Sequence, residues 1–131
     1  MDIILADNAI IAEFIGMQKT DIGWYDNREV LYTLKDNTFD TLLFHRSWDW
    51  LMPIIEYIEN INTEIIYQSR NKGIRILLKK NGCHIEDSKI IIWKDNTENP
   101  KLNKLDMTIS AISDYIQKYN SEVKKHKNKG M

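Results

Sequence analysis

The chain has a single cysteine, Cys83, among its 131 residues. A lone cysteine excludes an internal disulfide framework and fits a reducing cytoplasm. Its longest apolar runs, such as 90–93, have the length of a strand and are far too short to span a bilayer. No basic stretch precedes an apolar segment near Met1, so the sequence predicts a cytoplasmic protein without a secretory signal and without a membrane partner.

Glycine and histidine are also scarce, with five and three copies. No Walker loop, dinucleotide-binding glycine pattern or His-Glu-x-x-His motif is present. His45, Ser47 and Asp49 are triad residue types, but adjacency in sequence does not supply triad geometry, and helix capping accounts for Ser47 or Asp49. Cys83 and His84 would need distant carboxylates to complete a metal site. The sequence therefore predicts no catalytic residue, no metal and no cofactor.

The composition is that of a soluble globular protein, with 43% hydrophobic and 28% charged residues. A chain of this length most simply forms one domain. We predict a single α+β domain over residues 1–120, followed by a basic flexible tail over 121–131 that carries lysines and little apolar surface.

Charge is divided unevenly along the chain. Residues 1–65 carry 12 acidic and 4 basic side chains, a net charge of −8, whereas residues 66–131 carry 14 basic and 7 acidic side chains, a net charge of +7. Such polarity can match the two halves of a domain or a dimer to each other, or can attract an anionic partner. We favour the first explanation because the overall pI of about 6.3 is near neutral.

Three segments have the apolar spacing of helices. The first runs from Asp7 or Asn8 to Ile15 with Gly16 as its cap, and residues 3–6 either extend it or form a short strand. The third begins at Asn99-Pro100, an N-cap followed by a first-turn proline, and its apolar residues recur every three or four positions through Tyr119.

The second helix ends near Asn60, and Pro53 constrains where it begins. If Ser47 is the N-cap, Pro53 lies in the second turn and deletes an interior hydrogen bond. If the helix begins at Asp49 or Trp50, the proline costs less, and we favour this later start.

The strand-like segments are rich in Ile, Leu and Tyr and are separated by turn residues. Asn81-Gly82 is a hairpin signal, and residues 83–88 form either a loop or a further strand. We predict an α+β fold with a mainly antiparallel sheet of four to six strands and about three helices on one face. The segments are 22–26 and 30–34 joined by a turn at 27–29, then 41–44, 63–70, 74–79 and 89–93.

A basic hairpin is the first candidate binding site. A two-residue turn at Lys72-Gly73 places Arg70, Arg75 and Lys79 on one face, whereas a three-residue loop mixes the two faces. We favour the segregated register. Guanidinium groups pair well with phosphate oxygens, so this face is a candidate for an anionic, nucleotide-like ligand.

The second candidate is the aromatic stretch 47–53, Ser-Trp-Asp-Trp-Leu-Met-Pro. Trp48 and Trp50 are either core anchors between a helix and the sheet or stacking platforms for a base or a partner side chain. We favour the core role, and we include both residues among the candidate ligand contacts.

This motif also carries a resemblance. Together with Ile-Ala-Glu-Phe-Ile-Gly at 11–16, residues 54–59, Tyr115-Ile116 and Tyr119-Asn120, it resembles segments of a group of short uncharacterised proteins from Bacteroidota and their phages. The tryptophan motif is the specific part of the match. The resemblance implies a phage or mobile-element setting and supplies no catalytic residue.

The functional hypothesis is a small non-enzymatic cytoplasmic binding protein, encoded by a phage, that engages a host protein or sequesters a small anionic ligand. The alternative is a nucleic-acid-associated module that uses the basic second half. The regular alternation from Leu102 to Tyr119, with the opposed charges of the two halves, further predicts a homodimer.

Overall fold

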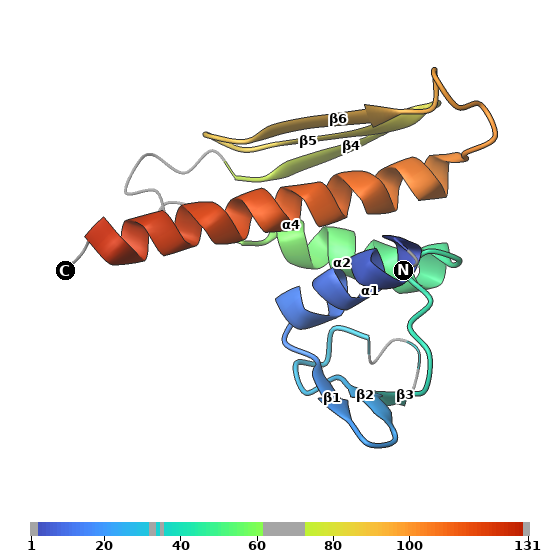
Figure 1. The fold of residues 1–131 in the computed structure, drawn as a ribbon, viewed down its shortest axis with the longest axis vertical. Coiled ribbons are helices and arrows are strands. Elements are labelled where there is room, and N and C mark those ends of the chain that lie inside the picture. Colours follow the sequence, from blue (N-terminus) through green and yellow to red (C-terminus); the bar gives the residue numbers. More distant parts are fainter. Residues whose placement is uncertain (1–2, 32–33, 35, 62–72, 130–131) are drawn as a thin grey trace.

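The computed structural model describes residues 3–31, 34, 36–61 and 73–129. In these residues three helices and two three-stranded antiparallel sheets form an α+β fold, so the predicted single sheet of four to six strands is not confirmed. A long helix, α4, lies between the larger sheet on one side and helices α1 and α2 on the other (Figure 1). The smaller sheet lies beyond α1. The elements are α1 (Ile3–Phe14), β1 (Gln18–Thr20), β2 (Gly23–Tyr25), β3 (Thr38–Phe39), α2 (Trp48–Glu59), β4 (Arg75–Lys79), β5 (Gly82–Glu86), β6 (Ile91–Asp95) and α4 (Lys104–Lys129).

Helix α4 begins later than the predicted Asn99. The Asn103 side chain accepts a hydrogen bond from the Asp106 backbone N–H, and the Asp106 carboxylate accepts one from the Asn103 N–H, each at 2.9 Å. This reciprocal cap satisfies two backbone donors that would otherwise have no partner at the helix start. Asn99 instead accepts a hydrogen bond from the Leu102 N–H at 3.0 Å, so the Asn-Pro pair forms a turn ahead of the helix.

Helix α4 also continues beyond residue 120, through the segment for which we predicted a flexible tail, and ends at Lys129. Val123 packs against the edge of the core, and Glu122 pairs with Lys125 at 3.5 Å, one helical turn away. Contacts at this spacing stabilise a helix, so the secondary structure has no break at residue 120.

The larger sheet has the register Leu77↔His84↔Trp93 across β4, β5 and β6. Residues 83–88, left open as loop or strand, therefore include strand β5. The two-residue turn before β5 is Lys80-Asn81, and Gly82 lies within the strand. A Cβ atom on Gly82 would collide with the backbone carbonyl of Lys94 on β6, so glycine is needed here for the close approach of two strands.

In the smaller sheet, strand β2 pairs with β1 and β3. The strand that we predicted at 30–34 is wrong for its described residues. Val30, Leu31 and Leu34 lie in turns and a short 3₁₀ segment. The cause is the buried carboxylate of Asp26, which accepts hydrogen bonds from the backbone N–H groups of Arg28 and Leu31. These bonds wind the chain tightly over residues 26–31. Glu29 takes a left-handed φ of 62°, a conformation that a strand cannot contain.

At the N-terminus, the helical alternative for residues 3–6 is confirmed, because α1 begins at Ile3.

Helix α2 begins at the earlier of the two predicted starts. Ser47 is the N-cap, with its carbonyl accepting hydrogen bonds from the N–H groups of Trp50 and Leu51, so Pro53 lies inside the helix. The later start that we favoured is wrong, and burial of one complete face of the helix offsets the cost of the proline. That face consists of Trp50, Leu51, Ile54, Ile55 and Ile58.

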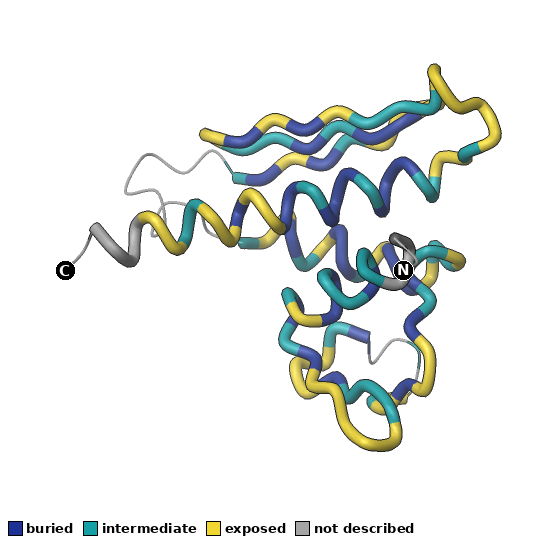
Figure 2. Tube along the Cα trace, in the orientation of Figure 1, coloured by how far each residue is buried: buried dark blue, intermediate teal, exposed yellow. Residues whose placement is uncertain are grey.

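The core role of Trp50 follows from its ring contacts. Its indole packs edge-on against Phe39 of β3 at 4.8 Å and against Phe44 at 5.3 Å between ring centroids. It is 8% exposed, whereas Trp48 is half-buried at the edge of the same cluster. Trp50 therefore joins α2 to the smaller sheet, and Figure 2 shows buried positions running through this part of the chain.

We predict that Trp50→Ala lowers the free energy of unfolding by about 3–5 kcal/mol, because it removes a large buried aromatic side chain. Met52→Ala is the matched control, since Met52 lies on the exposed side of the same helix and should cost less than about 0.5 kcal/mol. Urea unfolding measures both values. Equal stability of the two variants would contradict the core role.

Candidate functional site

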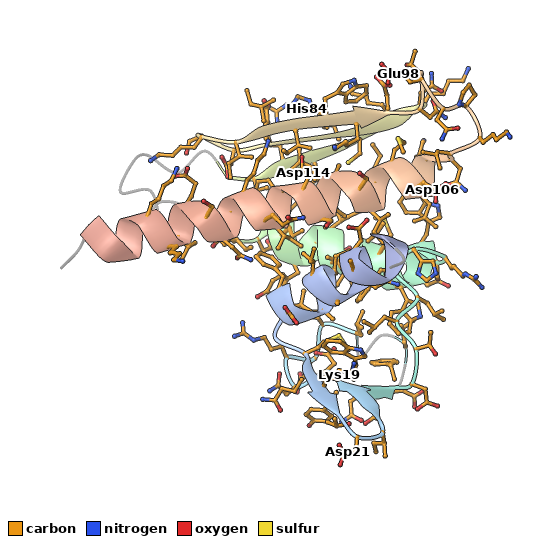
Figure 3. All side chains as sticks on the ribbon, in the orientation of Figure 1. Lys19, Asp21, His84, Glu98, Asp106 and Asp114 are labelled. Atoms are coloured by element: carbon orange, nitrogen blue, oxygen red, sulfur yellow. The ribbon has the colours of Figure 1, made fainter. Side chains whose placement is uncertain are left out.

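The outer face of β4–β6 is the surface of the larger sheet that is turned away from α4. Cross-strand register places Leu77, His84 and Trp93 in one row and Arg75, Glu86 and Ile91 in the next. Figure 3 shows His84 on this side of the sheet. We call these six residues together the outer face of β4–β6.

Two large apolar side chains on this face are exposed to solvent. Ile91 is 70% exposed and Trp93 is 49% exposed, and both lie on β6. Their neighbours Ile90 and Ile92 are buried against α4, as the alternation of a strand requires. Because α4 covers only the inner face of the sheet, the uninterrupted apolar run of β6 leaves every second residue uncovered (Figure 2). Adjacent exposed apolar residues of this kind typically mark an interaction surface.

The charged groups on the outer face of β4–β6 compensate one another. The Glu86 carboxylate lies 3.5 Å from Arg75 Nη1 and 3.7 Å from His84 Nε2. The His84 ring meets the Trp93 ring edge-on, 6.4 Å between centroids. The face thus combines an apolar strip on β6 with an internally paired ionic cluster on β4 and β5.

The indole N–H of Trp93 is also satisfied, because it donates to Asp95 Oδ2 at 2.7 Å. Hydrogen bonds from Thr97 and from the Trp93 indole lower the pKa of Asp95, which keeps that carboxylate ionised and able to accept. The indole ring is thus held by its edge, and about half of the side chain, 49%, is exposed to solvent.

The residues predicted to bind an anionic ligand do not all lie together. Arg75 and Lys79 lie on one face of β4 and are exposed, as strand alternation requires, but Arg75 is paired with Glu86. The hairpin register that we favoured at Lys72-Gly73 involves residues outside the described ones and stays a prediction. Arg70 lies outside the described residues, so the three-residue site stays a prediction. Trp48 and Trp50 are on α2, across α4 from the outer face of β4–β6 (Figure 1). The structure therefore does not bring Trp48 and Trp50 close to Arg75.

Sequence reasoning missed Ile91 and Trp93. The signal was present, since four consecutive apolar residues at 90–93 on a strand must place two of them on each face. Only a strand covered on both faces would bury all four.

The residues considered for a catalytic triad or a metal site have structural explanations. His45 Nδ1 lies 2.7 Å from Asn8 Nδ2, and Ser47 caps α2 through its backbone. Cys83 is buried under the sheet, and burial raises its thiol pKa to about 11, so the thiol stays protonated and a poor nucleophile near neutral pH. His84 follows Cys83 in the strand and projects to the opposite face, so the two cannot bind one metal ion together.

The described residues show neither a metal site nor a membrane-spanning helix. No group of three or more His, Cys, Asp or Glu side chains there is placed to hold a metal ion. Likewise, none of the helices in that part of the chain has the length and apolarity needed to cross a membrane.

A shallow basic pocket of about 340 Å³ lies beside the start of β6 and the second half of α4. Lys89, Lys118 and Lys125 line it together with Glu122, which pairs with Lys125 at 3.5 Å. The pocket therefore keeps a net positive charge and is the second candidate site.

No protein family, curated protein or solved structure shows a significant match to this chain. The resemblance to proteins of Bacteroidota and their phages stays a prediction.

A pair of identical substitutions on β6 tests whether the apolar strip is surface or core. Ile91→Thr should change the free energy of unfolding by less than about 0.5 kcal/mol, because Ile91 is exposed and threonine suits a strand. Ile92→Thr should cost at least about 2 kcal/mol, because it leaves a cavity and buries a hydroxyl group against α4. Urea unfolding of both variants decides, and a large loss for Ile91→Thr would show that this side chain is part of the packed core.

Proposed function

We propose that this protein is a non-enzymatic cytoplasmic binding protein that engages another protein through the outer face of β4–β6. The observation that carries the proposal is the exposure of Trp93 and Ile91 side by side on one strand. Tryptophan is enriched among residues that dominate binding energy at protein interfaces, especially where an apolar centre has a polar rim.

The fixed geometry of the face suits this role. The indole of Trp93 is held by Asp95, and Glu86 is held between Arg75 and His84, so little side-chain freedom is lost on binding. Because the ionic groups are already paired, the best partner is an apolar surface patch whose side chains pack on the indole. A strongly charged partner would have to break these pairs.

The resemblance to phage proteins supports a phage setting for this binding role. A phage-encoded protein with an apolar binding face would act by occupying a surface of a host protein. We therefore propose a host protein as the partner.

Site-specific photo-cross-linking tests the proposal. A photoreactive amino acid at Leu77, in the same row as Trp93, should yield an adduct with one host protein in cells that express the chain. The same amino acid at Met52, on α2, should not give this adduct. Adding Trp93→Thr to the Leu77 reporter should abolish the adduct, because the apolar anchor is gone, while thermal unfolding shows that the fold is retained.

Mass spectrometry of the cross-linked bands reads out the result. Equal adducts from the Leu77 and Met52 reporters, or an adduct that is insensitive to Trp93→Thr, would refute the proposal. An adduct with a second copy of the chain would instead identify the face as the interface of the predicted homodimer.

The nucleic-acid alternative is favoured by one observation, the basic pocket formed by Lys89, Lys118 and Lys125. If it binds single-stranded DNA or RNA, the affinity should fall steeply between low and physiological salt. Lys118→Glu with Lys125→Glu should abolish binding in fluorescence anisotropy, whereas Lys79→Glu, an exposed lysine on the sheet, should have a smaller effect. Equal effects of the two changes would reject the pocket as the binding site.

A further inference from the structure

A cavity of about 470 Å³ opens where α1, α2 and α4 meet, on the side of α4 that is turned away from the larger sheet. Its volume is within the usual range of small-molecule sites. Helices α1 and α2 run in the same direction, and the last turn of each lines the cavity opposite α4 (Figure 1). Since α4 separates it from the outer face of β4–β6, this cavity is a different site from the proposed protein-binding surface.

Three aromatic rings form the walls of the cavity. Phe14 stands perpendicular to Tyr57, at 90° with 5.9 Å between ring centroids, and to Tyr119, at 87° and 5.5 Å. A perpendicular pair of rings encloses a concave corner that is bounded by one face of each ring. Two such corners share the ring of Phe14, and all three rings line the cavity. Because the faces of aromatic rings carry negative potential, corners of this kind attract a cation.

The charge of the cavity lining is also negative. Among the described residues that line it, Glu13 is the one charged side chain, and Gln117 and Asn120 are neutral amides. Glu13 is exposed, and its carboxylate has no ion-pair partner in the part of the chain that the structure describes. The last turn of α2, where the negative end of the helix dipole lies, contains no basic residue. A bound cation would therefore meet an uncompensated carboxylate and an uncompensated helix end.

One cation, Arg28, contacts the wall from outside the cavity. Its Nη1 donates to the Tyr57 hydroxyl at 3.2 Å, and a Cβ atom on Gly16, beyond the end of α1, would collide with its Nε. The hydroxyl is on the ring edge, so Arg28 holds Tyr57 in place and does not line the cavity. Lys118, which precedes Tyr119, lines the basic pocket beside β6 instead.

We propose that this cavity binds a trimethylammonium group. Such a group carries a positive charge but has no N–H donor, so ring faces and apolar side chains satisfy it without a set of hydrogen-bond acceptors. Ile10 and Ile61 line the cavity together with the rings and are suited to contact the methyl groups. A primary ammonium group is more strongly hydrated and would lose more water contacts on entry. The group can belong to a small molecule such as choline or to a trimethylated lysine in a peptide.

An NMR titration of the backbone amides of the full chain with choline tests the proposal. Two analogues separate its two requirements: dimethylbutanol, the carbon isostere of choline, keeps the shape without the charge, and ethanolamine keeps the charge without the methyl groups. Each analogue should bind at least about tenfold more weakly than choline, because each loses part of the contact between the cation and the rings. The chemical shift changes should concentrate around Phe14, Tyr57 and Tyr119.

A short peptide that carries trimethyllysine, with its unmethylated form as the control, distinguishes the two sources. Tighter binding of the trimethylated peptide than of choline would identify a peptide as the source. Tighter binding of choline would identify a small molecule. In both cases the unmethylated peptide should bind more weakly than the trimethylated one.

Substitutions in the wall test the role of the rings and of the charge. Tyr57→Leu should weaken choline binding by about tenfold, because it removes a ring face, whereas Tyr57→Phe keeps the ring and should change binding by less than about twofold. Glu13→Gln should weaken binding by about threefold, as expected for an exposed charge. Its matched control is Glu59→Gln, since Glu59 is an exposed glutamate in the last turn of α2 that does not line the cavity. This control should leave binding unchanged, and thermal unfolding checks that each variant is folded.

The absence of choline binding at about 10 mM, equal affinity for choline and dimethylbutanol, or equal effects of the two Tyr57 substitutions overturns the proposal. Equal affinity for choline and ethanolamine overturns the choice of a methylated group. The comparisons between ligands use the unaltered chain, so they decide the outcome even where a variant fails to fold. Trp93→Thr, on the outer face of β4–β6, should leave choline binding unchanged, so this site and the proposed function are tested separately.

Discussion

Helix α4 packs against two layers at once, and the positions of α1 and of the larger sheet relative to each other depend on this. Three consecutive residues contact three different elements. Ser113 donates to Asp7 of α1 at 2.8 Å, Asp114 pairs with Lys94 of β6 at 3.8 Å, and Tyr115 donates to Asp87, which follows β5, at 2.6 Å. Burial raises the pKa of Asp7, in spite of the Ser113 hydrogen bond and nearby Lys94. The helix tolerates these polar contacts because each one joins it to a neighbouring layer.

This two-sided packing also explains the regular apolar alternation that suggested a subunit interface. Ile112, Tyr115 and Ile116 are fully buried within one chain. The alternation therefore needs no second copy to cover it, and the homodimer stays a proposal. The same packing uses only one face of the larger sheet, which is why the apolar residues of β6 that point the other way are exposed.

The sequence was sufficient for features that depend on long regular patterns. The apolar face of α2 and the course of α4 through Tyr119 follow from helical spacing, and the α+β class follows from that spacing together with the β-rich segments and turn signals. Features that depend on single polar contacts were not predictable in this way. The Asp26 carboxylate turns residues 26–31 away from a strand, and the reciprocal bonds of Asn103 and Asp106 move the start of α4.

In the candidate sites, too, regular patterns were predictable from the sequence and individual contacts between side chains were not. Strand alternation within 74–79 was sufficient to place Arg75 and Lys79 on one face of β4. The pairing of Arg75 with Glu86 was not predictable in this way, because it requires the register with β5. The apolar strand at 89–93 and the helices on one face of the sheet were both predicted, and together they imply the exposed strip of β6; only their combination was missed.

The ion pair between Lys94 and Asp114 has a consequence for solubility. Strand β6 is an edge strand in the described sheet, and an apolar edge strand is an open template for pairing with another chain. Lys94 lies on this edge and points toward α4, where Asp114 compensates its charge. A strand from another molecule that paired with β6 would draw the ammonium group further from water. A single lysine thus discourages fibril-like stacking along β6.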